Sequence, residues 1–327
     1  MFSGEAFIAL DICRRPNIWP HLKITSGMDI AYAPCYVLDV PEGHRFPMQK
    51  YALLKDQILH EGIVTASNFF EPEVMHETDI LRAHDAEYWH RTLNGLWTRQ
   101  EERRSGFPWS AAMVERERVI MQGTLDCAKR ALRSGTVAMN IAGGTHHAFA
   151  DRPEGFCLLN DLVLAADVLH SKGIAQRTLI VDLDVHQGNG TAALATHRDH
   201  IFALSLHGAS NYPFHKETSS LDIPLPDGTS DEAYLHALAP ALQEAFDRHH
   251  PDLVLYQCGV DVLATDKLGK LALSMEGCRK RDEMVFAACR KRQLGVACAM
   301  GGGYSEDVHR IVEAHMQTFR AARDIYT

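Results

Sequence analysis

The amino-acid sequence predicts a single α/β domain built around a parallel sheet with helices on both faces. Along the C-terminal two thirds of the chain, short apolar and β-branched runs alternate with longer amphipathic stretches of helical period. Nearly continuous apolar strands separated by helices are what a parallel sheet covered on both faces requires. No repeat, low-complexity segment or long Pro/Gly/Ser linker divides the 327 residues. A chain of this length can bury a full core without disulfide support.

The predicted strands alternate with helices in the order of successive βαβ units. In chain order the strands are Met28–Tyr32, Thr136–Ala142, Thr178–Asp182, Ile201–Leu206, Leu253–Cys258 and Gly295–Met300. Residues 1–27 hold Pro16 and Pro20 and show no clear period. We therefore expect them to form a loosely attached extension in front of a catalytic domain of residues 28–327.

The predicted helices are bounded by residues that favour helix ends. They are Met48–His60, Trp109–Arg133, Asn160–Lys172, Asp231–His249, Glu276–Lys291 and Ser305–Arg323. Ser110 and Ser305 are suited to the N-cap position, and Gly135 and Gly173 to the position just after a helix.

Composition excludes several classes of function. With 33 Lys and Arg against 42 Asp and Glu, the net charge of −9 argues against broad nucleic-acid binding, which needs a basic face. The sequence contains neither an apolar run long enough for a membrane helix nor a signal-peptide pattern at its start. The eight cysteines include no CxxC pair, which is typical of reduced thiols in a cytoplasmic protein. The oligomeric state is left open.

Chemically active residues gather where four of the predicted strands end. The segments that follow these strands are 143–147 (GGTHH), 182–190 (DLDVHQGNG), 259–261 (GVD) and 301–304 (GGGY). In an open α/β sheet the functional site lies beyond the carboxyl ends of the strands. The four segments are therefore expected to meet at one site.

Asp184, His186 and Asp261 form a plausible three-ligand set for Zn²⁺ or a similar divalent ion. Residues i and i+2 of an extended segment point the same way, so Asp184 and His186 can reach one ion, and Asp261 arrives from another strand. Three protein ligands leave a coordination position open for water or substrate, which is typical of a catalytic metal site. Ligand type alone leaves Fe²⁺ open beside Zn²⁺.

His146 and His147 are better suited to acid–base chemistry than to metal binding, because imidazole exchanges protons near neutral pH. Each needs a partner that orients its other ring nitrogen, and Asp182 and Asn189 are the candidates. Tyr304 offers a hydroxyl that could polarise a substrate carbonyl.

Five motifs in this order resemble those of the zinc-dependent histone deacetylase family. They are 144–148 (GTHHA), 154–161 (EGFCLLND), 181–190 (VDLDVHQGNG), 259–261 (GVD) and 301–304 (GGGY). The resemblance runs from about Met28 to the C-terminus and is closest to the class IV branch and its bacterial relatives. It implies the arginase/deacetylase fold, with an eight-stranded parallel sheet flanked by helices. It also implies hydrolysis that removes an acetyl or longer acyl group from a lysine-like amine.

The resemblance also assigns roles to the residues of the site. Asp184, His186 and Asp261 match the zinc ligands, and His147 matches the general base and acid. His146, hydrogen-bonded to Asp182, matches the electrostatic partner of the base. Tyr304 matches the residue that binds the carbonyl oxygen and then the oxyanion.

Further positions match the substrate channel and a structural ion. Phe156 matches one wall, with Gly155 beside it, and Tyr212 or Phe214 the opposite wall. Leu268 matches the rim, and Gly302 and Gly303 allow the close backbone approach before Tyr304. The residues that match a structural K⁺ site, reached mainly through backbone carbonyls, are Asp182, Asp184, His186, Ser205 and Leu206.

Asn189 is a departure from the class I pattern, in which a second Asp stands behind the base. A neutral partner stabilises an imidazolium less than a carboxylate does. We therefore expect His147 to be mostly neutral at pH 7 and His146 to keep its proton.

Three alternatives stay open at this point. One is an arginase-like hydrolase with two metal ions, although Gln187 stands after His186 and offers no further His or Asp ligand there. Another is a binding module for acyl-lysine without catalysis. The third concerns the substrate, which could be a small acetylated amine such as a polyamine in place of an acyl-lysine peptide or protein.

Overall fold

The computed structural model describes residues 27–326. The expected extension of residues 1–27 therefore lies, apart from Gly27, outside the described residues. Within the described part of the chain no helix is long and apolar enough to cross a bilayer. The seven cysteines of that part are all free thiols.

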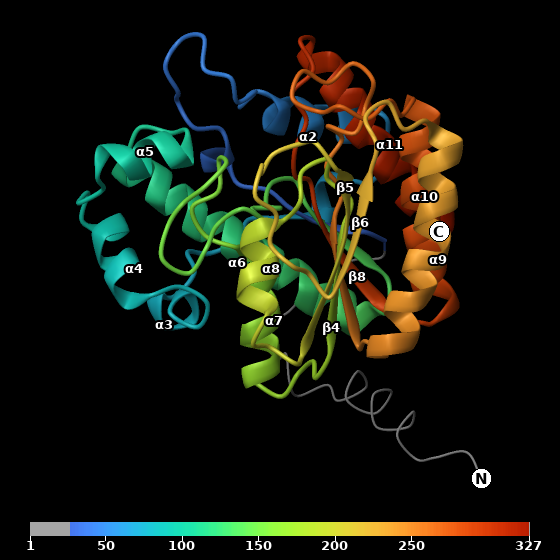
Figure 1. Cartoon of the computed structure of the whole chain (residues 1–327), viewed down its shortest axis with the longest axis horizontal. Coiled ribbons are helices and arrows are strands. Elements are labelled where there is room, and N and C mark those ends of the chain that lie inside the picture. Colours follow the sequence, from blue (N-terminus) through green and yellow to red (C-terminus); the bar gives the residue numbers. More distant parts are fainter. Residues whose placement is uncertain (1–26, 327) are drawn as a thin grey trace.

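Eight parallel strands form one sheet, as expected (Figure 1). In spatial order the strands are β2 (Phe69–Phe70), β1 (Asp29–Ala31), β3 (Val137–Asn140), β8 (Gly295–Ala299), β7 (Leu253–Gln257), β4 (Thr178–Asp182), β5 (Ile201–Gly208) and β6 (Leu221–Leu225). Every residue of β3, β4, β7 and β8 is buried, which accounts for their nearly continuous apolar sequences. Because these four strands are neighbours, the loops that follow them lie side by side.

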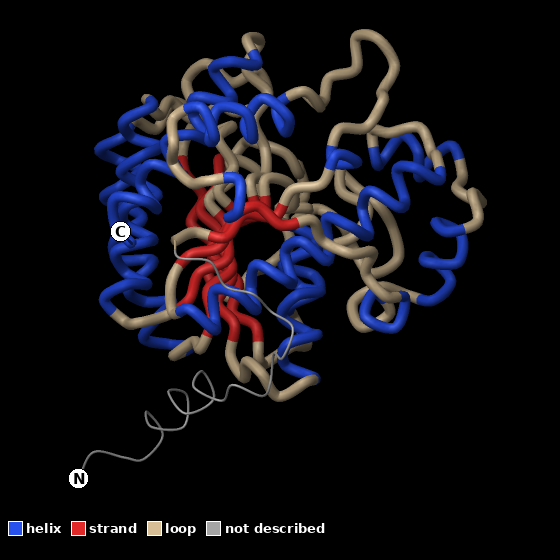
Figure 2. The backbone as a smooth tube through the Cα atoms, turned by 180° about the vertical axis from the view of Figure 1, so that it is seen from behind, coloured by secondary structure: helices blue, strands red, loops and turns tan. Residues whose placement is uncertain are grey.

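Helices cover both faces of the sheet. They are α2 (Lys50–His60), α3 (Glu77–Ile80), α4 (Ala86–Leu93), α5 (Arg99–Ser105), α6 (Ala111–Ser134), α7 (Asp161–Ser171), α8 (Asn189–Ala195), α9 (Asp231–His249), α10 (Met275–Lys291) and α11 (Val308–Tyr326). On one face α6 packs with α7 and α8 follows. On the other face α9, α10, α11 and α2 pack in that order. Figure 2 shows the strands enclosed between these helices. The short helices α3, α4 and α5 stand apart at one side (Figure 1).

The capping predictions were correct for α6 and wrong for α11. Ser110 accepts a hydrogen bond from the backbone N–H of Met113, and Gly135 ends α6 in the left-handed region. The last helix begins at Val308, three residues after the predicted start at Ser305. Asp307 precedes it and accepts from the backbone N–H of His309 at 2.9 Å, so Asp307 is the capping residue.

Two strands and four helices were absent from the sequence prediction. The edge strand β6 contains Pro224 and is only partly buried, so it lacks the apolar pattern of the central strands. β2 has only two residues. The helix α8 begins at Asn189-Gly190, directly behind the loop that carries His186, and glycine there hides its helical character.

Candidate active site

Asp184, His186 and Asp261 meet where β4 and β7 end. Their ligand atoms lie within 4.8 Å of one another, and all three residues are buried. His186 Nδ1 lies 3.0 Å from Asp184 Oδ1 and 3.2 Å from Asp261 Oδ2. Ligands about 2.0–2.1 Å from a tetrahedral Zn²⁺ stand roughly 3.3 Å apart. The group therefore has the spacing that such an ion needs.

The buried carboxylates of Asp184 and Asp261 favour a positive charge beside them. Burial, and then the neighbouring carboxylate of Asp184, raise the pKa of Asp261 to about 7. Burial opposes a charge on His186, but its hydrogen bonds to the two carboxylates raise its pKa to about 10. Two buried carboxylates thus attract positive charge to this point, which a divalent ion would supply.

Within residues 27–326, Asp184, His186 and Asp261 form the only cluster of three or more His, Cys, Asp or Glu residues that could hold a metal ion. Gln187 is turned to other partners: its amide donates to the backbone oxygen of Glu217 at 2.7 Å and to Asp222 Oδ1 at 2.9 Å. This geometry disfavours the arginase-like alternative, which needs a second set of ligands.

Backbone groups hold the ligand carboxylates in place. Gly302 N–H donates to Asp184 Oδ2 at 2.9 Å, and Val185 N–H donates to Asp261 Oδ1 at 2.9 Å. A Cβ on Gly302 would lie 2.0 Å from Asp261 Oδ2. Position 302 therefore requires glycine because the loop after β8 runs directly against the metal-binding group.

Arg281 on α10 supports the ligand loops from beneath and was not predicted from the sequence. It is fully buried, pairs with Asp282 at 2.8 Å, and donates to the carbonyl oxygens of Leu183 at 3.2 Å and Gly259 at 2.6 Å. These carbonyls belong to the segments that carry Asp184 and Asp261. Only the fold reveals this link, since a single Arg on an amphipathic helix gives no such signal.

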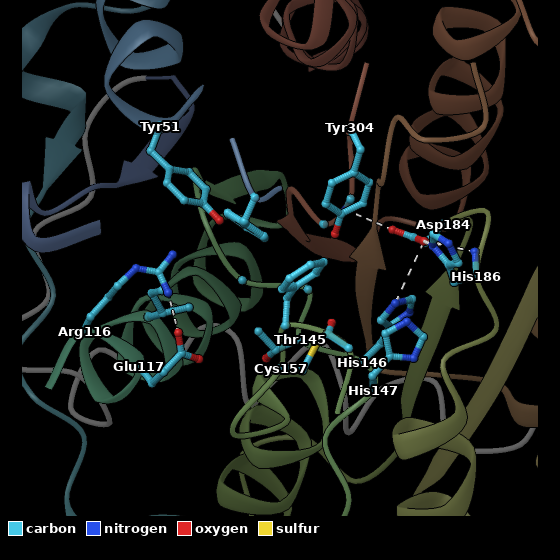
Figure 3. Close-up of a pocket in the computed structure, with 18 residues that line it drawn as sticks. Tyr51, Arg116, Glu117, Thr145, His146, His147, Cys157, Asp184, His186 and Tyr304 are labelled. Atoms are coloured by element: carbon cyan, nitrogen blue, oxygen red, sulfur yellow. Dashed lines mark hydrogen bonds and ion pairs between the residues drawn. The ribbon is translucent and has the colours of Figure 1, made fainter. Parts of the chain in front are cut away.

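The two adjacent histidines lie beside Asp184 and His186 (Figure 3), and each is hydrogen-bonded to a different partner. His146 Nδ1 is 2.7 Å from Asp182 Oδ2, and His147 Nδ1 is 2.6 Å from Asn189 Oδ1. Burial opposes a charge on His146, but Asp182 outweighs it and raises its pKa to about 9. Burial, and then the charges of His146 and His186, hold the pKa of His147 well below its ordinary value.

Tyr304 lies on the loop after β8 and closes the site from the other side (Figure 3). Its backbone N–H donates to Asp266 Oδ2 at 2.6 Å, and Asp266 Oδ1 accepts from the N–H of Leu268 at 2.8 Å. Asp266 thus connects Leu268, the residue expected at the rim of the substrate channel, to the loop that carries Tyr304. Burial, and then the carboxylates of Asp261 and Asp184, raise the pKa of Tyr304 well above its ordinary value. The hydroxyl therefore keeps its proton and can act as a donor.

The expected channel residues stand at different distances from the site. The Phe156 ring lies 5.9 Å from that of Tyr304. The Tyr212 ring lies 5.3 Å from His147 and 6.5 Å from His186, whereas Phe214 is 85% exposed. Of Tyr212 and Phe214, Tyr212 is therefore the residue that lies beside His147 and His186.

Gly155 and Phe156 form a sharp turn against His147. Their φ angles are 55° and 66°, which is unusual for a phenylalanine. A Cβ on Gly155 would lie 2.6 Å from the ring of His147. A side chain there would displace the imidazole, so glycine is required.

A cavity of about 40 Å³ joins the metal-binding group to a charged inner end. Figure 3 shows Tyr51, Arg116 and Glu117 at that end, across from Asp184 and His186. Arg116 pairs with Glu117 and donates to the backbone oxygen of Tyr36 at 2.8 Å. Burial raises the pKa of Glu117 to about 7. Sequence reasoning missed the place of Arg116 and Glu117 at this cavity, because a mixed charge run on a helix is typical of a solvated face.

The residues expected at a structural K⁺ site also lie together. Asp182 stands opposite Ser205 in the register of β4 and β5. All five residues of the set are buried: Asp182, Asp184, His186, Ser205 and Leu206. Potassium binding itself stays a prediction.

Comparisons with known proteins agree with this geometry. A model of the histone deacetylase domain matches residues 44–319. An uncharacterized protein of Picosynechococcus sp. is 41% identical over 300 residues, which cover 92% of this chain and 100% of that protein. Histone deacetylase 2 of Arabidopsis thaliana is 27% identical over 299 residues, which cover 88% of this chain and 77% of that protein.

The fold is also that of solved relatives. The crystal structure of an HDAC homolog from Aquifex aeolicus is 23% identical and covers 92% of this chain and 84% of its own, with a TM-score of 0.77. The family model spans most of the sequence, and the predicted sheet is present. The chain therefore belongs to the histone deacetylase family of hydrolases, within the arginase/deacetylase superfamily.

Proposed function

We propose that the protein is a metal-dependent amidohydrolase that removes an acetyl or other short acyl group from a lysine-like amine. The observation that carries the proposal is the buried group Asp184, His186 and Asp261 directly beside the neutral imidazole of His147. Zn²⁺ is the proposed metal, with Fe²⁺ as the alternative that the same ligands would accept.

A bound divalent ion supplies a more acidic water molecule and polarises the acyl carbonyl. Residues of the chain transfer the proton and stabilise the developing charge. His147 accepts the proton of the attacking water and passes it to the departing amine. The Tyr304 hydroxyl donates to the carbonyl oxygen as negative charge develops there. His146, kept charged by Asp182, adds positive charge beside the reacting centre.

The walls of the site support a slender substrate. Phe156 and Tyr212 would flank the aliphatic stem of the amine, and the acyl group would point toward the cavity between the metal-binding group and Arg116. A cavity of about 40 Å³ with a charged end suits an acetyl group better than a long fatty-acyl chain.

The proposal also includes a structural K⁺ ion near β4 and β5. The free thiols support a reducing, cytoplasmic setting as part of the proposal.

Turnover on a matched substrate series tests the proposal. Acetyl-, octanoyl- and myristoyl-lysine peptides and acetylated polyamines are incubated with zinc-loaded enzyme, and release of the acyl group is measured. We expect the highest kcat/KM on an acetylated substrate and no measurable turnover by Asp261→Ala. Binding of acyl-lysine peptide without turnover would contradict the proposal in favour of a binding module. Preference for polyamines would identify the small-amine alternative.

A further inference from the structure

Glu154 stands behind the catalytic base, at the end of a short chain of hydrogen bonds. His147 Nδ1 lies 2.6 Å from Asn189 Oδ1, and the amide nitrogen of Asn189 donates to Glu154 Oε1 at 2.7 Å. The hydroxyl of Tyr212 donates to the same carboxylate oxygen at 2.6 Å. The carboxylate of Glu154 is therefore linked to His147 through the side chain of Asn189, and not by a direct hydrogen bond.

The turn that forms the channel wall also fixes Glu154. The backbone N–H groups of Glu154 and Cys157 each donate to the other residue's carbonyl oxygen at 2.9 Å. The two positive φ angles of Gly155 and Phe156 make this a type I′ turn. The Glu154 side chain is only 15% exposed, and Arg152 Nε lies 3.7 Å from its second oxygen. The carboxylate is thus held at a set position against Asn189.

This position decides which way the amide of Asn189 faces. A carboxylate offers only acceptors, so the Asn189 NH₂ group must face Glu154 and its oxygen must face His147. In the flipped amide, two oxygen atoms would oppose each other at about the same 2.7 Å separation. The amide oxygen in turn requires a hydrogen on His147 Nδ1. Nε2 is then the ring nitrogen that is free to accept a proton.

We propose that Glu154 is a positioning residue for the base. Its carboxylate orients the Asn189 amide, and the amide holds His147 in the Nδ1–H tautomer that catalysis needs. The inference rests on the proposed amide hydrolysis and deepens it, because it explains how a neutral residue can replace a carboxylate behind the base. The second hydrogen bond ties the same carboxylate to Tyr212 and thus to the channel wall.

Kinetics of Glu154 variants give the first test. Loss of a residue that orients a functional group from behind typically costs about 10- to 100-fold. We expect Glu154→Ala to lower kcat in this range, with a much smaller change in KM. Glu154→Gln should be milder, because its amide oxygen can still accept from Asn189. Asp151→Asn is the matched control, since it removes a carboxylate from the same loop and should change kcat less than about twofold.

A double variant tests the direction of the hydrogen bonds. Asn189→Asp alone sets two carboxylates face to face, so kcat should fall. Adding Glu154→Gln supplies an NH₂ group to the new Asp, and kcat should recover at least about tenfold over Asn189→Asp alone. If the two losses simply add, Glu154 does not act through residue 189 and the proposal is overturned.

The tautomer of His147 provides a readout that needs no turnover. Nitrogen-15 chemical shifts of labelled histidine distinguish Nδ1–H from Nε2–H, and His147→Gln identifies the signal in the zinc-loaded protein. We expect the Nδ1–H form in the wild type and a shift toward Nε2–H in Glu154→Ala. An unchanged tautomer in that variant overturns the proposal whatever its kcat. A wild type without turnover on any substrate contradicts the proposed function alone, because the tautomer is still measured.

Discussion

Two neighbouring imidazoles in this site, one charged and one neutral, differ in the group to which each is hydrogen-bonded. His146 is hydrogen-bonded directly to the carboxylate of Asp182, and its pKa is raised to about 9. His147 is hydrogen-bonded to the neutral amide of Asn189, and its pKa is well below the ordinary value. The rings are 4.1 Å apart and equally buried. Burial opposes a charge on both rings, and the carboxylate bonded directly to His146 is what raises its pKa above that of His147.

The largest difference between the two histidines is expected in turnover. His147→Gln removes the group that moves the proton, so kcat should fall by roughly 10²–10⁴-fold. His146→Gln removes a charge but no proton carrier, so its loss should be at least about tenfold smaller. Both variants are measured at saturating acetyl-lysine peptide, with zinc content determined in parallel. A larger loss for His146→Gln would reverse the two roles.

The pH dependence of kcat/KM sharpens the comparison. Activity should require neutral His147 and charged His146, so the acid limb should lie below pH 6.5 and the alkaline limb near pH 9. Asp182→Asn removes the charge that raises the pKa of His146, so its alkaline limb should move to lower pH. A shift of one pH unit would lower kcat/KM about fivefold at pH 9, and up to about tenfold at higher pH, relative to wild type. An unmoved alkaline limb would show that His146 does not set it.

The central strands and the ligand loops could be predicted from the sequence because their signals are local. A fully buried parallel strand is apolar throughout, and the residue that follows it belongs to the active edge of the sheet. This is why Asp184, His186 and Asp261 were placed correctly beside one another. The edge strand β6 escaped prediction because partial burial and Pro224 remove that signal.

Residues that act on the site from a distance in the sequence could not be predicted. Arg281 reaches the ligand loops from α10, and Arg116 and Glu117 reach the inner cavity from α6. Each is a charged residue on an amphipathic helix, where a solvated position is the usual outcome. Glu154 stands next to a recognised motif residue, but only the geometry shows that its partner is Asn189. These contacts depend on the packing of helices, which no local pattern encodes.

The smallest effect on catalysis, and a clear one on stability, is expected at a third histidine. His84 Nδ1 lies 2.9 Å from the carbonyl oxygen of Phe149, and its Nε2 accepts from the N–H of Asn160 at 3.0 Å. It is thus held in the same neutral tautomer as His147, but by backbone groups, and burial lowers its pKa to about 4. Between pH 6.5 and pH 4 the unfolded chain binds the proton that the folded protein refuses. The free energy of unfolding should therefore fall by about 2 kcal/mol between pH 7 and pH 5 through this residue.

Urea unfolding at a series of pH values measures this change in the free energy of unfolding. His84→Gln can form both hydrogen bonds without titrating and should lose that part of the pH dependence, whereas His60→Gln, at an exposed position of α2, should keep it. Equal pH dependence in wild type and His84→Gln would show that burial at His84 has no such cost.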